Sequence, residues 1–275
     1  MTDKSDLLNK TKLFCRNACE KVKAFASKAE ASEKFRTAVS YLSWQKAKPY
    51  IEKIWLLLKN FTTQQPKTAV FIYVCLFCAF SISFIDEPLA VARMETESNP
   101  IFKFLSDFNP SGWWFLILAF LWLTYMAAGG LSLTTDAFEK NLQKAKAVAF
   151  IFLTLLVSSA ATFVLNIIIG RYTPEMLDSM HLYGFSAFRM RVTETSFPSF
   201  GAQSIWAVAV AVASFMPKFA KILYALACLV TVSIVLTAQC YLSDAVMGTY
   251  VGIMMFFVAK WIVSENRENT PLISL

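Results

Sequence analysis

Five long apolar runs constrain this 275-residue chain more than any other feature of its sequence. A helix needs about 20 residues to cross the roughly 30 Å hydrocarbon layer of a membrane. Runs near that length fall at about 68–85, 113–133, 145–169, 219–239 and 245–263. A sixth run, from Ala202 to Met216, is shorter, but Pro217 closes it and we count it as a spanning helix. The sequence therefore predicts an all-α polytopic membrane protein with about six transmembrane helices.

The composition excludes a water-soluble domain of this size. Hydrophobic residues make up 56% of the chain and the mean hydropathy is +0.50, which is more apolar surface than a soluble fold can bury. Charged residues are only 16% and crowd before Lys67. We therefore expect three parts: a cytoplasmic basic amphipathic helical tail over 1–66, a six-helix transmembrane domain over 67–264, and a cytoplasmic C-terminal tail over 265–275.

The tail before Thr68 is strongly basic, with 14 Lys or Arg residues against six Asp or Glu residues. Apolar residues recur in it at helical spacing, as in Phe14, Ala18 and Val22, which predicts helix with a break near Pro49. The favoured role is an interfacial helix held on anionic lipid. A docking arm for a protein partner is the alternative, and nucleic acid is not expected because no matching fold signature accompanies the charge.

The positions of Lys and Arg between the apolar runs predict the orientation. Basic residues gather at 140–146, at 218–221 and from Lys260 to Arg267, and such segments stay in the cytoplasm. Both termini should then be cytoplasmic, with 86–111, 171–201 and 240–243 on the other side. The pattern suits a bacterial inner membrane, and an organellar membrane is the alternative.

Three segments at helix ends on that outer side carry the most informative residues. The first runs from Asn166 through Arg171 to Thr173-Pro174, and the second is Pro198-Ser199-Phe200-Gly201. The third is Ser233-Ile234, then five residues, then Cys240, with Asp244 four positions further on.

Taken together, the three segments resemble the signature motifs of the PAP2 phosphatase family, and the resemblance extends over about 68–263. It implies a PAP2-like bundle with a site that opens outward. Charged and imidazole residues of the family are replaced at five positions, which here read Asn166 for Lys, Thr173 for Arg, Gly201 for His, Ile234 for Arg and Cys240 for His. Ser199 and Asp244 remain.

Family chemistry, as the resemblance implies it, needs a phosphate cradle of Lys and two Arg, an attacking His, a second His as acid and an orienting Asp. Glycine has no proton to give and isoleucine has no charge. Loss of general acid–base catalysis alone costs roughly 10²- to 10⁴-fold in rate. We therefore expect no family-type catalysis. The only histidine, His181, matches neither motif position and is interpreted as a loop residue.

The leading hypothesis is a catalytically inactive scaffold or accessory subunit that holds a lipid in the former active-site cavity. The expected ligand site is Arg171, Ser199, Arg189, Arg191 and Asp244, which would receive a phosphate head group. Membrane lipids and protein partners are expected, and no cofactor, metal or nucleic acid. The alternative is a divergent, active lipid phosphatase acting on phosphatidate, lipid A or polyprenyl diphosphate, with a Cys240 thiolate as one conceivable nucleophile. A transporter is a third class, which the scarcity of charge in the spans disfavours.

Small residues and cysteines within the apolar runs have structural interpretations. Gly248 and Gly252 form a small-xxx-small pair, which predicts a close helix contact. Cys75 and Cys78 have no second pair and are poor zinc ligands. Asp244 falls at a predicted helix start, where a carboxylate is favoured as a cap.

Overall fold

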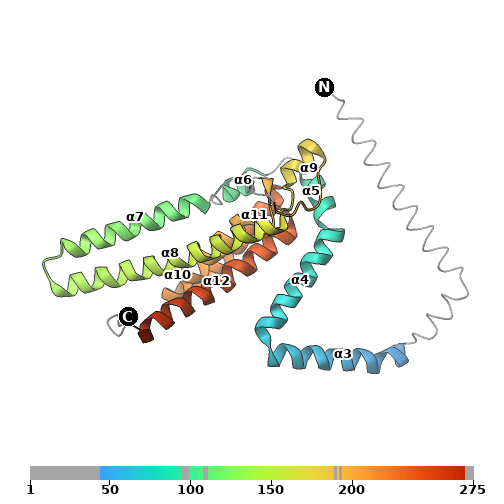
Figure 1. Cartoon of the computed structure of the whole chain (residues 1–275), viewed down its shortest axis with the longest axis horizontal. Coiled ribbons are helices and arrows are strands. Elements are labelled where there is room, and N and C mark those ends of the chain that lie inside the picture. The colour runs from blue at the N-terminus through green and yellow to red at the C-terminus, as the bar shows by residue number, and fades with distance from the viewer. Residues whose placement is uncertain (1–43, 95–98, 108–110, 189–190, 192–193, 270–275) are drawn as a thin grey trace, which may run out of the picture. The chain divides into compact units, whose positions relative to one another are not determined.

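The computed structural model of the chain describes residues 44–94, 99–107, 111–188, 191 and 194–269 (Figure 1). It divides into two compact units, residues 1–69 and 70–275, which are described separately.

In the first unit, helix α3 (Trp44–Gln64) is the N-terminal part of the chain that the structure describes. The expected break near Pro49 is wrong, because α3 continues through this proline. The missing N–H of Pro49 removes a single backbone hydrogen bond, and the helix continues on both sides of it. Tyr50 and Trp55 are 72% and 69% exposed. The tail's earlier residues, 1–43, lie outside the described residues, and its membrane or docking role stays a prediction.

Six long apolar helices make up most of what the structure describes of the second unit, and their length and composition confirm an all-α polytopic membrane protein. Five have the length and composition to span a membrane, and α10 is shorter. They are α4 (Pro66–Phe84, of which 70–84 belong to this unit), α7 (Ser111–Gly130), α8 (Thr135–Ile169), α10 (Phe200–Phe215), α11 (Ala220–Leu236) and α12 (Leu242–Asn269).

Short helices occupy most of the connections between the long ones. They are α5 (Asp86–Met94), α6 (Pro100–Ser106), α9 (Pro174–Met180) and the 3₁₀ turn η2 (Pro217–Phe219). Within the described ranges, extended pairing is limited to two isolated bridges, Arg171 with Phe185 and Tyr172 with Thr195. These bridges hold the segment between α8 and α10 against itself.

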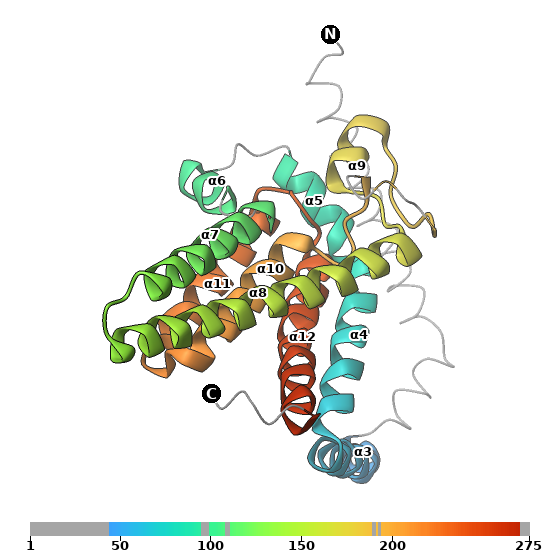
Figure 2. The same ribbon diagram turned by 60° about the vertical axis from the view of Figure 1, so that its left-hand side comes forward.

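Helix α10 is the centre of the bundle, since it packs against α7, α8, α11 and α12 (Figure 2). Its contact with α12 is close enough to require glycine. A Cβ atom on Gly248 would lie 2.5 Å from the carbonyl oxygen of Ser199, and one on Gly252 would lie 2.5 Å from that of Gln203. The predicted close contact at this pair is confirmed.

Helix α8 begins ten residues before the apolar run that predicted it. The Thr134 hydroxyl accepts from the N–H of Ala137 and caps the helix start. The helix ends at Gly170, which has a left-handed φ of 59°. A Cβ there would lie 1.8 Å from the carbonyl oxygen of Ser186, so only glycine fits. This stop directs the next residue, Arg171, toward the interior.

Candidate functional site

Arg171 is fully buried between two carboxylates from distant parts of the chain. Its Nη2 lies 2.9 Å from Asp86 Oδ2, and its Nη1 donates to Asp244 Oδ1. Its guanidinium carbon also lies 4.1 Å from the centroid of the Tyr241 ring. Burial lowers the pKa of Arg171, but the carboxylates of Asp244 and Asp86 outweigh it and raise the pKa above its ordinary value. Arg171 is therefore a permanent cation already paired with two anions.

Both carboxylates are fully engaged by the surrounding backbone and hydroxyl groups. Asp86 Oδ1 accepts from the Ser81 hydroxyl at 2.7 Å and from the Ser243 N–H at 3.2 Å. Asp244 Oδ2 accepts from the Ser196 hydroxyl and from the Tyr241 N–H, which lies just before α12. Asp244 thus acts as the predicted helix-start group and as half of an ion pair.

Asn166 and Ser199 join the first two motif segments through structural hydrogen bonds. The Asn166 side chain is buried at the end of α8 and donates from Nδ2 to the carbonyl oxygen of Pro198 at 2.9 Å. Ser199 caps α10 by accepting from the N–H of Ala202 at 3.4 Å. Its own N–H donates to the Asp244 carbonyl oxygen at 3.0 Å. The three segments are therefore brought together as the resemblance implies.

A cavity of about 380 Å³ opens where these segments meet. Four of the five replaced motif positions line it: Thr173, Gly201, Ile234 and Cys240, with Ser199 beside them. Ser196, Thr195 and Gln239 add polar groups, and Glu175 adds a carboxylate. The part of its lining that the structure describes contains no Lys, Arg or His.

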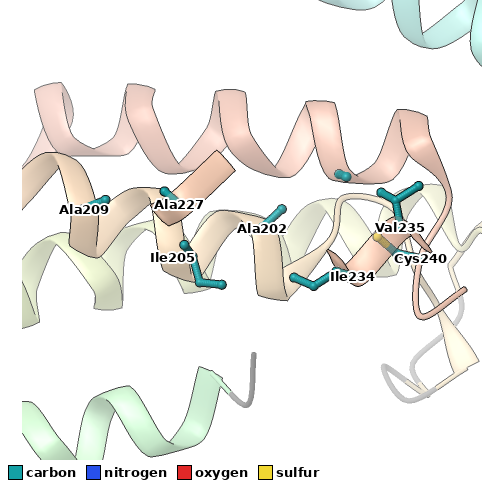
Figure 3. Close-up of a cluster of buried hydrophobic side chains, with 8 residues drawn as sticks. Ala202, Ile205, Ala209, Ala227, Ile234, Val235 and Cys240 are labelled. Atoms are coloured by element: carbon teal, nitrogen blue, oxygen red, sulfur yellow. The ribbon is translucent and has the colours of Figure 1, made fainter. Parts of the chain in front are cut away.

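Two of the replaced positions have joined the hydrophobic core. Ile234 and Cys240 belong to one apolar cluster with Ala202 and Val235 (Figure 3). Burial raises the pKa of the Cys240 thiol well above its ordinary value, and the Asp244 carboxylate raises it further. The thiol is therefore protonated at neutral pH, and a protonated thiol is a poor nucleophile.

The remaining expected ligand residues are separated. Arg191 is exposed and pairs with Glu194 at 3.1 Å, while Arg189 lies outside the described residues. His181 is exposed and ends α9 in a left-handed conformation. Of the five residues expected to receive a phosphate, the structure brings Arg171, Ser199 and Asp244 together, but Arg171 faces carboxylates. Across the described ranges, no group of three or more His, Cys, Asp or Glu side chains could hold a metal ion.

Asp86 is the site residue that sequence reasoning missed. It lies at the start of the predicted outer segment 86–111, but its side chain is completely buried. The available signal was its position directly after an apolar run, where a carboxylate needs a charged partner. The partner lies 85 residues further along the chain, so the sequence alone could not pair them.

Comparison with known proteins assigns one part of the chain to a superfamily. Residues 147–268, which contain all three motif segments, match the PAP2 superfamily. This part of the chain is a PAP2 superfamily domain. The match covers the motif-bearing half of the resemblance, which the sequence placed over about 68–263.

Two known proteins are similar to this PAP2-domain chain. One is the lipid A 1-phosphatase of Rhizobium etli, 24% identical over 183 residues that cover 65% of this chain and 79% of that protein. The other is the crystal structure of a transmembrane PAP2 type phosphatidylglycerolphosphate phosphatase from Bacillus subtilis. It is 14% identical with a TM-score of 0.45, and the similarity covers 72% of this chain and 96% of that one.

Proposed function

We propose that this PAP2-family membrane protein has no phosphatase activity and serves as a scaffold or accessory subunit that holds a lipid head group in the motif cavity. One observation carries the proposal: the cavity persists, but Thr173, Gly201, Ile234 and Cys240 line it where the family has cations and histidines. The described lining residues include no cation that could bind a phosphoryl group, and the Glu175 carboxylate would repel one.

The ion pairs of Arg171 with Asp86 and Asp244 support the same conclusion. The guanidinium has two carboxylate partners and contacts the hydroxyls of Ser243 and Tyr183 as well. If Arg171 bound a phosphate instead, Asp86 and Asp244 would stay buried without their cation, at a cost of several kcal/mol. The hydroxyl, amide and carboxylate groups of the lining favour an uncharged, hydroxyl-bearing head group over a phosphate.

The test is an assay of the full-length protein in nanodiscs, with phosphatidate, lipid A and undecaprenyl diphosphate as substrates. The Rhizobium etli lipid A 1-phosphatase serves as the positive control for lipid A. We expect phosphate release no higher than that of empty nanodiscs, together with co-purified lipid or a stoichiometric protein partner in mass spectrometry.

Turnover above the empty-nanodisc rate would overturn the proposal and favour the divergent lipid phosphatase. Comparison of Cys240→Ser with Ser214→Ala would then locate the chemistry, since Ser214 lies far along α10 from the motif cavity. Loss of turnover in Cys240→Ser alone would assign the attack to the thiol in spite of its raised pKa.

A further inference from the structure

A second cavity, of about 730 Å³, lies between α8, α10 and α12. Residues 143–153 of α8, 214–215 of α10 and 256–264 of α12 contribute its lining. The motif cavity, in contrast, lies near Asn166, Ser199 and Asp244, toward the other ends of the same helices. The second cavity is therefore remote from every motif position.

Part of the lining of this cavity is aromatic and apolar. Phe150, Phe215 and Phe256 come from three different helices, and all three line it. The Phe150 ring centroid lies 5.7 Å from that of Phe215 and 5.8 Å from that of Phe256, both in edge-to-face geometry. Such packing fixes an apolar surface on which an acyl chain can lie.

Two lysines from different helices also line the cavity. Lys146 on α8 and Lys260 on α12 both line it, with the polar groups of Gln143, Ser214 and Ser264. Neither lysine forms an ion pair within the described part of the chain, and no carboxylate is among the described lining residues. The cavity thus joins an apolar wall to two lysines that have no carboxylate partner among the described residues.

We propose that this cavity binds an anionic glycerophospholipid, with the phosphodiester between Lys146 and Lys260 and an acyl chain against the three phenylalanines. Basic pockets between membrane helices select anionic head groups by charge. Both lysines lie in segments that the positive-inside pattern predicts to be cytoplasmic, where anionic lipid is available. A soluble phosphate would leave the aromatic wall unused, and an apolar partner helix would leave the lysines without anions. The inference is independent of the proposed function.

The test titrates the full-length, delipidated protein in detergent with phosphatidylglycerol or phosphatidylcholine and counts bound lipids by native mass spectrometry. We compare Lys146→Gln/Lys260→Gln with the matched control Lys218→Gln/Lys221→Gln, whose lysines belong to the same predicted side but do not line the cavity. At about 1 kcal/mol per lysine, we expect phosphatidylglycerol affinity to fall about 5-fold for one change and about 30-fold for both. The control and phosphatidylcholine binding should not change.

A second variant tests the acyl-chain half without altering charge. Ala149 lines the cavity, so Ala149→Trp should fill it and lower phosphatidylglycerol occupancy, whereas Ala128→Trp on the exposed face of α7 should not. Excess glycerol 3-phosphate, which has the charge but no acyl chain, should not compete.

Three outcomes would overturn the inference. Equal binding of phosphatidylcholine would remove the charge requirement, and an unchanged lysine double variant would remove the assigned residues. Competition by glycerol 3-phosphate would identify a soluble phosphate as the ligand in place of a lipid.

Discussion

At the residue scale, the groups that stand where the PAP2 family has charge have acquired structural contacts. Asn166 ties α8 to the start of α10 through the Pro198 carbonyl oxygen, and Ile234 and Cys240 pack in the core. Asp244 keeps its carboxylate, but its partner is the Arg171 guanidinium. The three motif segments thus form a packed contact between helices beside a small cavity.

The first prediction concerns the buried ion cluster of Arg171, Asp86 and Asp244. Arg171→Met should lower the free energy of unfolding by about 3–5 kcal/mol, because it leaves Asp86 and Asp244 buried without a cation. The measurement is reversible denaturation in detergent micelles, followed by tryptophan fluorescence.

The matched control is Arg191→Gln, which removes an ion pair in which Arg191 is 79% exposed. Solvent screens such a pair, so the free energy of unfolding should change by less than about 1 kcal/mol. If both variants lost the same stability, the two carboxylates would not depend on Arg171 in the folded protein.

At the element scale, length and hydropathy predicted the long helices but not the residues at which each one begins. Each apolar run is a helix, yet α8 extends ten residues earlier because Thr134 caps it before a polar stretch. The short helices α5, α6 and α9 were missed, since seven to nine residues carry little periodic signal. The predicted break near Pro49 is wrong because a proline removes a single backbone hydrogen bond, and α3 continues in spite of that loss.

The sequence predicted which helix ends meet at the candidate site but not which charged side chains pair there. The motif spacing correctly grouped Asn166, Ser199 and Asp244, because residues at helix ends are positioned by the helices themselves. The spacing gave no indication of Asp86, since a buried ion pair across 85 residues depends on the tertiary fold. That pairing places two carboxylates against the Arg171 guanidinium.

The second prediction tests the close contact of α12 with α10. Gly252→Ala should lower the free energy of unfolding by about 1–3 kcal/mol, because its Cβ would lie 2.5 Å from the backbone oxygen of Gln203 and the helices must separate. Denaturation of the variant in detergent micelles measures the change.

Gly130→Ala is the control for this variant, because a Cβ there would have no atom within 4 Å beyond its chain neighbours and the backbone of its own helix. Alanine also has the better helix propensity, by about 1 kcal/mol, so the control should be neutral or slightly stabilised. Equal effects at Gly252 and Gly130 would mean that the tight approach of α12 to α10 is absent in solution.

At the scale of the whole molecule, the shortest apolar helix decides the topology. Helix α10 has 16 residues, roughly 24 Å of helix. One end lies beside Asn166 of α8, by way of Pro198, and the other end beside Phe150 of α8, by way of Phe215. It therefore runs alongside the central part of a spanning helix. With α10 counted as a span, the number of crossings is even.

The third prediction follows from that even number: both termini lie on the cytoplasmic side, as the Lys and Arg pattern also requires. In a bacterial host, a C-terminal green fluorescent protein fusion should fluoresce and a C-terminal alkaline phosphatase fusion should be inactive. The same pair fused at the N-terminus should behave identically. If the two ends reported opposite sides, the chain would cross five times, and α10 would be a re-entrant helix that enters and leaves from one face. That result would contradict the packing of α10 along α8, and with it the second cavity, whose lining brings Lys146 and Lys260 together.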